Sequence, residues 1–232
     1  MKYRLTNETI KVGEVILHRI ECVEAFLNVK VGDKGGWIEK ENNLCQKDYA
    51  WVSGNAKVSG NAKVWGNADV FGNAWVCGNA WVCGNAKVCD NAQVRGNAKV
   101  CGNAKVYDGA WVSGNAQVSG NAWVYGNAWV RGNAKVSGNA QVYGAAWVYD
   151  NAWVCDNAEV CGSAQVYGNA VVSGNAKVYG NAKVYDGAWV SGNAQVSGIA
   201  WVYGNAWVRG NAKVSGNANL QKSDFGKCTI IV

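Results

Sequence analysis

The chain has 232 residues, no proline, 30 glycines, only three phenylalanines and a formal net charge of +6 at pH 7. This composition argues against a globular domain with an aromatic core and favours a core of small and branched aliphatic side chains. Nucleic-acid proteins usually concentrate more positive charge on one face, so we expect no nucleic-acid partner.

Two further features bear on location. The chain opens on Met1-Lys2-Tyr3-Arg4 and then polar residues, which is not the apolar run of a secretory leader. No apolar stretch is long enough to cross a bilayer. We therefore expect a cytoplasmic protein of a bacterium or a phage-infected cell, with no membrane partner.

Residues 1–49 are predicted to form an N-terminal cap and entry coil. Short apolar runs at Tyr3–Leu5, Ile10–Val12 and Val15–Ile20 are separated by Thr6–Thr9 and a Gly-Glu turn. Such runs with polar breaks predict a small antiparallel meander. Residues Glu21–Val29 are expected to form a helical turn or two.

The cap leads into the first coil before the regular repeat begins. Ile38 and Leu44 are six residues apart, whereas Leu44 and Val52 are eight apart. This spacing predicts two extra residues in one corner, near Gln46–Asp48.

Residues 50–217 repeat the hexad Ala-x-Val-x-Gly-Asn 28 times without an insertion or a deletion. In the first hexad, strand alternation sends Ala50 and Val52 inward and Trp51 and Ser53 outward, and a Gly-Asn pair makes the corner. A period of six is typical of a parallel β-solenoid in which three short strands form a triangular coil of about 18 residues. We predict an all-β rod of about nine coils.

The corner residues differ in what they tolerate. The Gly position is Gly or Asp throughout, whereas the Asn position also admits Ala145, Ser163 and Ile199. Gly, Asn and Asp accept a positive φ, which a β-branched residue avoids. The left-handed residue of each corner is therefore predicted at the Gly position.

Residues 218–232 are predicted to be a C-terminal cap or tail. Leu220 holds the last core position of the repeat. Beyond it, Ile230-Ile231-Val232 is expected to fold back as a lid.

Nine cysteines raise the question of a metal or a disulfide. Cys77, Cys83 and Cys89 are six residues apart and therefore lie on three different sides of a triangular coil, where they cannot share an ion. Cys83 and Cys101 are one coil apart, within disulfide reach. In a reducing cytosol we expect both to be thiols, and we expect no metal site.

The cap carries a resemblance to a known family. Lys2–Leu5, Leu17–Ile20 and Gly32–Leu44, followed by Asn-Ala-x-Val hexads, resemble bacterial and prophage hexapeptide-repeat proteins that are catalogued under an acyltransferase label. The resemblance covers essentially the whole chain. It implies a left-handed β-helix and, through the wider superfamily, acetyl-CoA-dependent acyl transfer.

The residues needed for acyl transfer are not assembled in this sequence. Hexapeptide acyltransferases use a histidine as general base, and the one histidine here, His18, lies in the cap. Asp69 and Glu159 are the only acids at mid-strand outward positions, and they lie far apart. We therefore expect no catalytic residue and no cofactor, with an acyltransferase kept as the alternative.

Aromatic residues dominate the outward positions. Eleven of the 13 tryptophans follow the inward Ala of a hexad: Trp51, Trp75, Trp81, Trp111, Trp123, Trp129, Trp147, Trp153, Trp189, Trp201 and Trp207. Spacing by 18 places three of them on one side in successive coils, Trp111, Trp129 and Trp147. A second outward column stacks four tyrosines: Tyr149, Tyr167, Tyr185 and Tyr203.

Residues 182–217 copy residues 104–139, except that Ile199 replaces Asn121. The offset is not a whole number of coils, so Trp111 and Trp129 recur on another side as Trp189 and Trp207. A face-specific active site would not survive such a rotation, which favours a non-catalytic scaffold.

These tryptophan and tyrosine columns are the candidate binding residues. Strand propensity alone explains stacked aromatic rings equally well. The alternative is a contact with a protein partner or a second copy of the chain, because large exposed apolar patches are uncommon on monomers. A carbohydrate or single-stranded nucleic acid is a further alternative.

Overall fold

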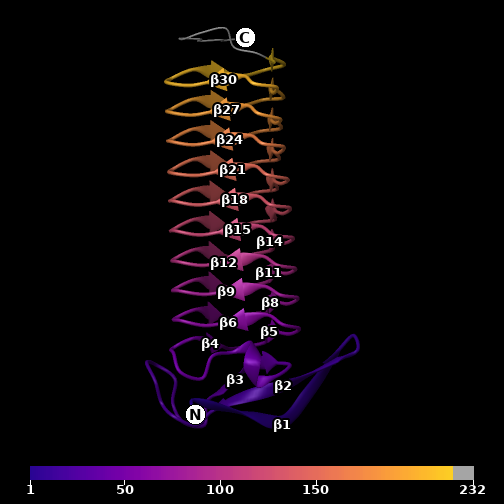
Figure 1. The fold of residues 1–232 in the computed structure, drawn as a ribbon, viewed down its shortest axis with the longest axis vertical. Helices are drawn as coiled ribbons and strands as arrows, with labels where there is room; N and C mark the ends of the chain where they lie inside the picture. The colour runs from indigo at the N-terminus through magenta and orange to yellow at the C-terminus, as the bar shows by residue number, and fades with distance from the viewer. Residues whose placement is uncertain (222–232) are drawn as a thin grey trace.

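The fold is that of a computed structural model, which describes residues 1–221. A rod of stacked coils rises from a small β-rich cap at the N-terminal end (Figure 1). Within the described part of the chain, the one helical element is the 3₁₀ turn η1 (Glu41–Asn43). The predicted all-β parallel solenoid is confirmed.

The coils form three sheets, because every third hexad returns to the same side. Sheet A continues from the cap through β5 (Lys57–Val58), β8 (Trp75–Val76), β11 (Gln93–Val94), β14 (Trp111–Val112), β17 (Trp129–Val130), β20 (Trp147–Val148), β23 (Gln165–Val166), β26 (Lys183–Val184), β29 (Trp201–Val202) and β32 (Asn219–Leu220).

Sheet B contains β4 (Trp51–Val52), β7 (Asp69–Val70), β10 (Lys87–Val88), β13 (Lys105–Val106), β16 (Trp123–Val124), β19 (Gln141–Val142), β22 (Glu159–Val160), β25 (Lys177–Val178), β28 (Gln195–Val196) and β31 (Lys213–Val214). Sheet C contains β6 (Lys63–Val64), β9 (Trp81–Val82), β12 (Lys99–Val100), β15 (Gln117–Val118), β18 (Lys135–Val136), β21 (Trp153–Val154), β24 (Val171–Val172), β27 (Trp189–Val190) and β30 (Trp207–Val208).

Parallel pairing at a register of 18 holds neighbouring coils together. In sheet A, Trp111 N–H donates to Ala128 O at 2.9 Å and Ser113 N–H donates to Val130 O at 2.9 Å. The backbone N–H of the Asn at each corner also donates to the carbonyl oxygen of the residue at the Gly position one coil further. Each two-residue strand is therefore supported by further backbone bonds on its flanks.

The core is made of the inward Ala and Val of every hexad. Val118 and Val124, for example, have no exposed surface, and the same holds for almost every inward position. Because each side contributes only two inward residues, small Ala and branched Val suffice to fill the triangle, and between the two ends of the rod stacking in register gives each valine a valine above and below.

The corners adopt positive φ at the Gly position, as predicted. Every corner glycine of the repeat and all five corner aspartates (Asp90, Asp108, Asp150, Asp156 and Asp186) lie in this region. Gly198 has φ 68°, whereas Ile199 is not among the residues with positive φ. The β-branched residue therefore avoids the strained conformation.

The corner aspartates add a bond that glycine lacks. Asp156 Oδ2 accepts the backbone N–H of Gly174, one coil further, at 2.9 Å, and Asp108 accepts that of Gly126 at 3.1 Å. The cap supplies the same kind of acceptor to the first coil, where Asp48 accepts from Gly66 N–H and Glu39 accepts from Gly60 N–H.

The cap is an antiparallel sheet of three strands, β1 (Tyr3–Val12), β2 (Val15–Cys22) and β3 (Lys34–Ile38). Strand β3 then pairs in parallel with β5 and so joins the cap to sheet A. The meander is as expected, but Thr6–Thr9 does not separate two strands. It is an irregularity inside β1, because β2 pairs with the segments on both sides of it.

The expected helical turns over Glu21–Val29 are wrong. Strand β2 runs to Cys22, whose backbone pairs with Gly32 and Asp33, and an isolated bridge joins Phe26 to Val29. Tertiary pairing therefore overrides the weak local preference of this segment.

The predicted two-residue insertion is confirmed by the register. Ile38 pairs with Val58 and Leu44 with Val64, both 20 residues apart, whereas Val52 pairs with Val70, 18 residues apart. The extra residues lie between Leu44 and Val52.

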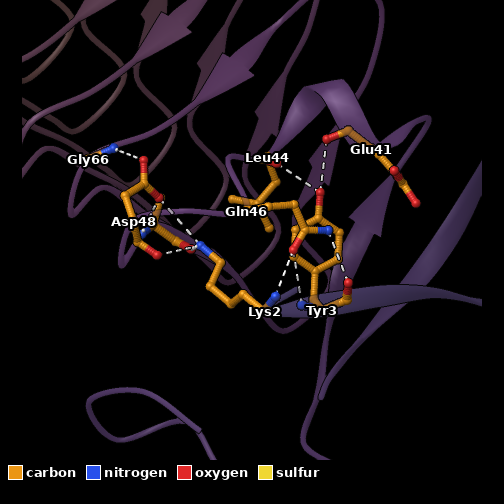
Figure 2. A network of polar contacts seen from close by, with 8 residues as sticks. Lys2, Tyr3, Glu41, Leu44, Gln46, Asp48 and Gly66 are labelled. Atoms are coloured by element: carbon orange, nitrogen blue, oxygen red, sulfur yellow. Dashed lines mark hydrogen bonds and ion pairs between the residues drawn. The ribbon is translucent and has the colours of Figure 1, made fainter. Parts of the chain in front are cut away.

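A polar network fastens the cap to this irregular corner (Figure 2). Lys2 Nζ donates to Ala50 O at 2.7 Å and Asp48 O at 2.9 Å, and Tyr3 Oη donates to Leu44 O at 2.8 Å. The Gln46 side chain pairs with the backbone of Tyr3. Burial lowers the pKa of Lys2, and this shift is opposed by the nearby Asp48 carboxylate. The network orders the first coil edge, which would otherwise be an open template for strand addition.

The expectation of free thiols at Cys83 and Cys101 is wrong, because these residues form a disulfide between neighbouring coils of sheet C. Their Cα atoms lie 4.6 Å apart. The expectation came from the redox state of a cytosol, not from geometry, which allowed the bond.

At the C-terminal end of the rod, Leu220 pairs with Val202, and the lid expected at Ile230–Val232 lies outside the described residues.

We predict that the inward and outward positions respond differently to the same charge. Val118→Asp buries an unpaired carboxylate in the core and should lower the free energy of unfolding by at least about 3 kcal/mol. Gln117→Asp places the carboxylate on an exposed position one residue away and should change it by less than about 0.5 kcal/mol. Thermal unfolding followed by circular dichroism measures both. Equal effects would contradict the inward assignment of valine.

A second prediction concerns the corners. A Cβ on Gly120, which has φ 70°, would lie 2.8 Å from Gly138 O. Gly120→Ala should therefore destabilise the rod by about 1–2 kcal/mol. Gly120→Asp should cost less, because its carboxylate can accept the N–H of residue 138. Denaturant unfolding of the two variants compares them, and an Asp variant no more stable than the Ala variant would contradict the capping role.

Candidate interaction surface

Sheet A brings the two predicted aromatic columns into one connected row of rings. Trp111 stacks on Trp129 at 4.8 Å between ring centroids, and Trp129 stacks on Trp147 at 5.0 Å. Trp147 then meets Tyr149 edge to face at 6.4 Å. The tryptophan column thus passes directly into the tyrosine column.

The tyrosine column continues the row toward the C-terminal end. Tyr149, Tyr167, Tyr185 and Tyr203 stack at 4.7, 4.8 and 5.1 Å, and Trp201 meets Tyr185 edge to face at 6.4 Å. We call these eight side chains, Trp111, Trp129, Trp147, Tyr149, Tyr167, Tyr185, Trp201 and Tyr203, the aromatic strip. Figure 1 shows its strands from β14 to β29 on one side of the rod.

Two arginines pack against the rings of the aromatic strip that lie nearest the N-terminal end. The Arg95 guanidinium lies 4.0 Å from the centroid of the Trp111 ring, and that of Arg131 lies 5.1 Å from the rings of both Trp147 and Tyr149. Cation–π contacts of this kind fix ring orientation while leaving the outer ring edges in solvent. All members of the strip except Trp201 are half-buried by their neighbours.

The hydroxyls of Tyr149, Tyr167 and Tyr185 remain neutral at physiological pH because their pKa values are raised. Burial raises the pKa of Tyr167 to about 12, with smaller contributions from Tyr149 and Tyr185 on either side. Burial also raises the pKa of Tyr149 and of Tyr185. Neutral phenols can donate hydrogen bonds to a partner, so the strip combines apolar ring surface with polar tips.

The remaining predicted residues lie apart from the strip. Trp189 and Trp207 belong to sheet C, where they stack at 5.7 Å, as the rotated internal copy predicts. Trp51 points outward but is covered by the cap, since Tyr3 and Phe26 pack edge to face against it. It is therefore part of the core and not of a surface.

Sequence reasoning did not single out a second tyrosine column on sheet B. Tyr107, Tyr125 and Tyr143 stack at 4.9 Å, with Trp123 edge to face against Tyr107. Their spacing of 18 is visible in the sequence, so the same signal that identified the first column could have found this one.

The titratable side chains offer little chemistry. His18 Nδ1 lies 3.3 Å from Thr6 O in the cap. Burial and then the Asp90 side chain raise the pKa of the Cys89 thiol to about 12, and burial raises that of Cys155 to about 11. A protonated thiol is a poor nucleophile and a poor metal ligand.

No group of three His, Cys, Asp or Glu side chains within residues 1–221 is arranged to hold a metal ion. Asp69 pairs with Lys87 at 3.8 Å and Glu159 pairs with Lys177 at 3.1 Å, so the two outward acids are separate surface ion pairs. Searched over the same residues, the structure has no helix long and apolar enough to span a membrane.

Comparisons with known proteins agree with the repeat architecture. A family described as the YdcK beta solenoid repeat matches residues 116–132 and 164–177. These segments are similar to that repeat, but they cover a small part of the chain. The search of curated proteins found no match. The likeness supports a β-solenoid repeat protein and carries no statement about catalysis or partners.

Proposed function

We propose that the protein is a non-catalytic interaction module that docks a protein partner along the aromatic strip. The observation that carries this proposal is the unbroken contact of eight rings along one face of the rod. A structural role that needed only strand packing would not require the tryptophan and tyrosine columns to join.

The composition of the strip suits a protein interface. Tryptophan, tyrosine and arginine are the residues most enriched among interface hot spots. Here Trp111 and Trp147 each carry an arginine over the ring. The rings are fixed by stacking, so docking a partner would cost little side-chain entropy.

The length of the aromatic strip is also compatible with a protein–protein interface. From β14 to β29 it spans five coil steps, which at one strand spacing each is about 24 Å. An interface of standard size buries about 800 Å² on each partner. A partner that lies along the rod axis could reach the whole strip.

Acyl transfer has less support. The chain has one histidine, which contacts the cap backbone, and three of its free thiols, Cys77, Cys89 and Cys155, have raised pKa values. Nothing in the repeat supplies the general base that this reaction needs.

The test compares two sets of three tryptophans on different sheets. Trp111, Trp129 and Trp147 on sheet A are changed together to Gln, and Trp153, Trp189 and Trp207 on sheet C form the matched control. We expect the sheet A variant to lose association by about tenfold or more, and the control to keep it. Partner capture and sedimentation velocity measure hetero- and self-association separately.

Equal association of both variants with every partner and with themselves would show that the strip serves strand packing only. Circular dichroism must show the same sheet signal for both variants. If only self-association is lost, the partner is a second copy of this chain.

A further inference from the structure

Sheet C presents its tryptophans differently from sheet A. Trp153 and Trp189 are 46% and 47% exposed, whereas Trp129 is half-buried within the aromatic strip. The cause lies in the same outward column, because Trp129 stacks between Trp111 and Trp147, whereas Trp153 lies between Lys135 and Val171. The second outward column also differs, because on sheet A it includes Arg and Tyr besides Ser and Cys, whereas on sheet C, between its two ends, it holds only Ser and Cys.

The first outward positions of the strands from β6 to β30 form one column of side chains, and Figure 1 shows these strands stacked along the length of the rod. It contains Lys63, Trp81, Lys99, Gln117, Lys135, Trp153, Val171, Trp189 and Trp207. We call this column the sheet C ridge. Trp153 is oriented by a bond from its Nε1 to Ser137 Oγ at 3.0 Å, so its ring leans over the smaller column.

The charge of the ridge is positive and lies between β6 and β18, where it is evenly spaced. Lys63, Lys99 and Lys135 recur on every second coil, and no carboxylate occupies an outward strand position of sheet C within residues 1–221. The carboxylate at the adjoining corner, Asp156, accepts a bond from Gly174 N–H. Lys99 also lies 4.8 Å from the Trp81 ring, so cations and rings are neighbours along the ridge.

A ladder of amides runs beside the ridge at the following corner. From Asn67 to Asn193, each Asn of this corner donates a side-chain N–H to the side-chain oxygen of the Asn one coil further, at 2.9–3.1 Å. Each amide retains a second N–H and a further lone pair directed at solvent. The other two corners are interrupted, at Gly187 beside sheet A and at Gly109, Ala145, Ser163 and Ile199 beside sheet B.

A cavity lies at the end of the ridge that adjoins the cap. Lys63, Trp65 and Trp81 of the first coils and Asn42, Cys45 and Asp48 of the cap line a cavity of about 510 Å³. Asp48 is already bonded to Lys2 and to the amides of Ala50 and Gly66, so its charge is compensated. This cavity could receive the end of a chain that lies along the ridge.

We propose that the sheet C ridge binds a linear polysaccharide that carries an acidic group on every second sugar. Exposed indole rings can pack against the apolar faces of sugar rings, and the amide ladder can pair with sugar hydroxyls at every coil. The lysines are two coils apart, about 9.5 Å. This spacing matches a polymer whose charges are separated by a neutral unit.

Single-stranded nucleic acid fits less well. A strand of stacked nucleotides carries one phosphate per about 3.4 Å, which is nearly three times the density of the cations on the ridge. The polysaccharide proposal concerns a different sheet from the aromatic strip and does not depend on the proposed protein contact.

The test uses hyaluronan oligosaccharides, which carry a carboxylate on alternate sugars, with chitin oligosaccharides as the neutral comparison and oligothymidine as the nucleic acid. Calorimetric titration of the full chain should show binding of hyaluronan and weaker binding of the other two. Changing Lys135 and Trp153 to Gln on sheet C should weaken hyaluronan binding by about tenfold or more.

The chain offers a matched control on sheet B. Lys105 and Trp123 form the same pair on adjacent coils as Lys135 and Trp153. Changing this pair to Gln should leave hyaluronan binding within about twofold. The proposal is overturned if the parent does not bind hyaluronan, if both double variants lose binding equally, or if oligothymidine binds more tightly and is lost with the sheet C pair.

Discussion

The structure depends on one constraint, a corner with positive φ that recurs every six residues. At these corners the backbones of neighbouring coils approach so closely that a Cβ on Gly114 or Gly174 would lie about 3 Å from backbone atoms of the next coil. Glycine relieves this crowding. The five corner aspartates occupy the same conformation, and four of them accept a hydrogen bond at a carboxylate oxygen from a glycine N–H of the next coil. The spacing of the corners therefore determines the six-residue period, and three such periods determine the register of 18 residues between paired strands of neighbouring coils.

Once the corners and the inward Ala and Val are fixed, two outward positions in each hexad are free. The fold places no demand on them beyond strand compatibility. Their contents differ from sheet to sheet: arginine beside stacked rings on sheet A, and lysine beside exposed indoles on sheet C. A scaffold of this kind can carry separate binding surfaces without altering its core, which is how we interpret the aromatic strip and the sheet C ridge.

Much of this architecture could be predicted from the sequence because it is local and periodic. The inward positions, the conformation of the corner Gly and the two-residue insertion before Val52 each follow from counting residues. The cap could not be predicted as well. The segment Glu21–Val29 has no period, and its conformation depends on pairing with Gly32 and Asp33. The Cys83–Cys101 bond was within reach by spacing, but spacing does not determine redox state.

The candidate surfaces were predictable in part for the same reason. Spacing by 18 identified the columns of Trp111 and Tyr149 but not their meeting at Trp147, which depends on side-chain orientation. The difference in exposure between Trp129 and Trp153 arises from the neighbours one coil away, which are tryptophans for Trp129 and Lys135 and Val171 for Trp153, and the exposed fraction depends on packing that the spacing does not give.

The central claim, that repeated corners fix a register of 18 along the whole rod, is tested most directly by amide hydrogen exchange resolved to single residues. The account predicts protection with a period of six through residues 50–217, with a minimum at each corner glycine. Gly126, Gly168, Gly174 and Gly204, whose amides are bonded to a corner aspartate, should be better protected than corner glycines whose amides have no carboxylate acceptor. Protection without a period of six, or confined to one end of the rod, would contradict it.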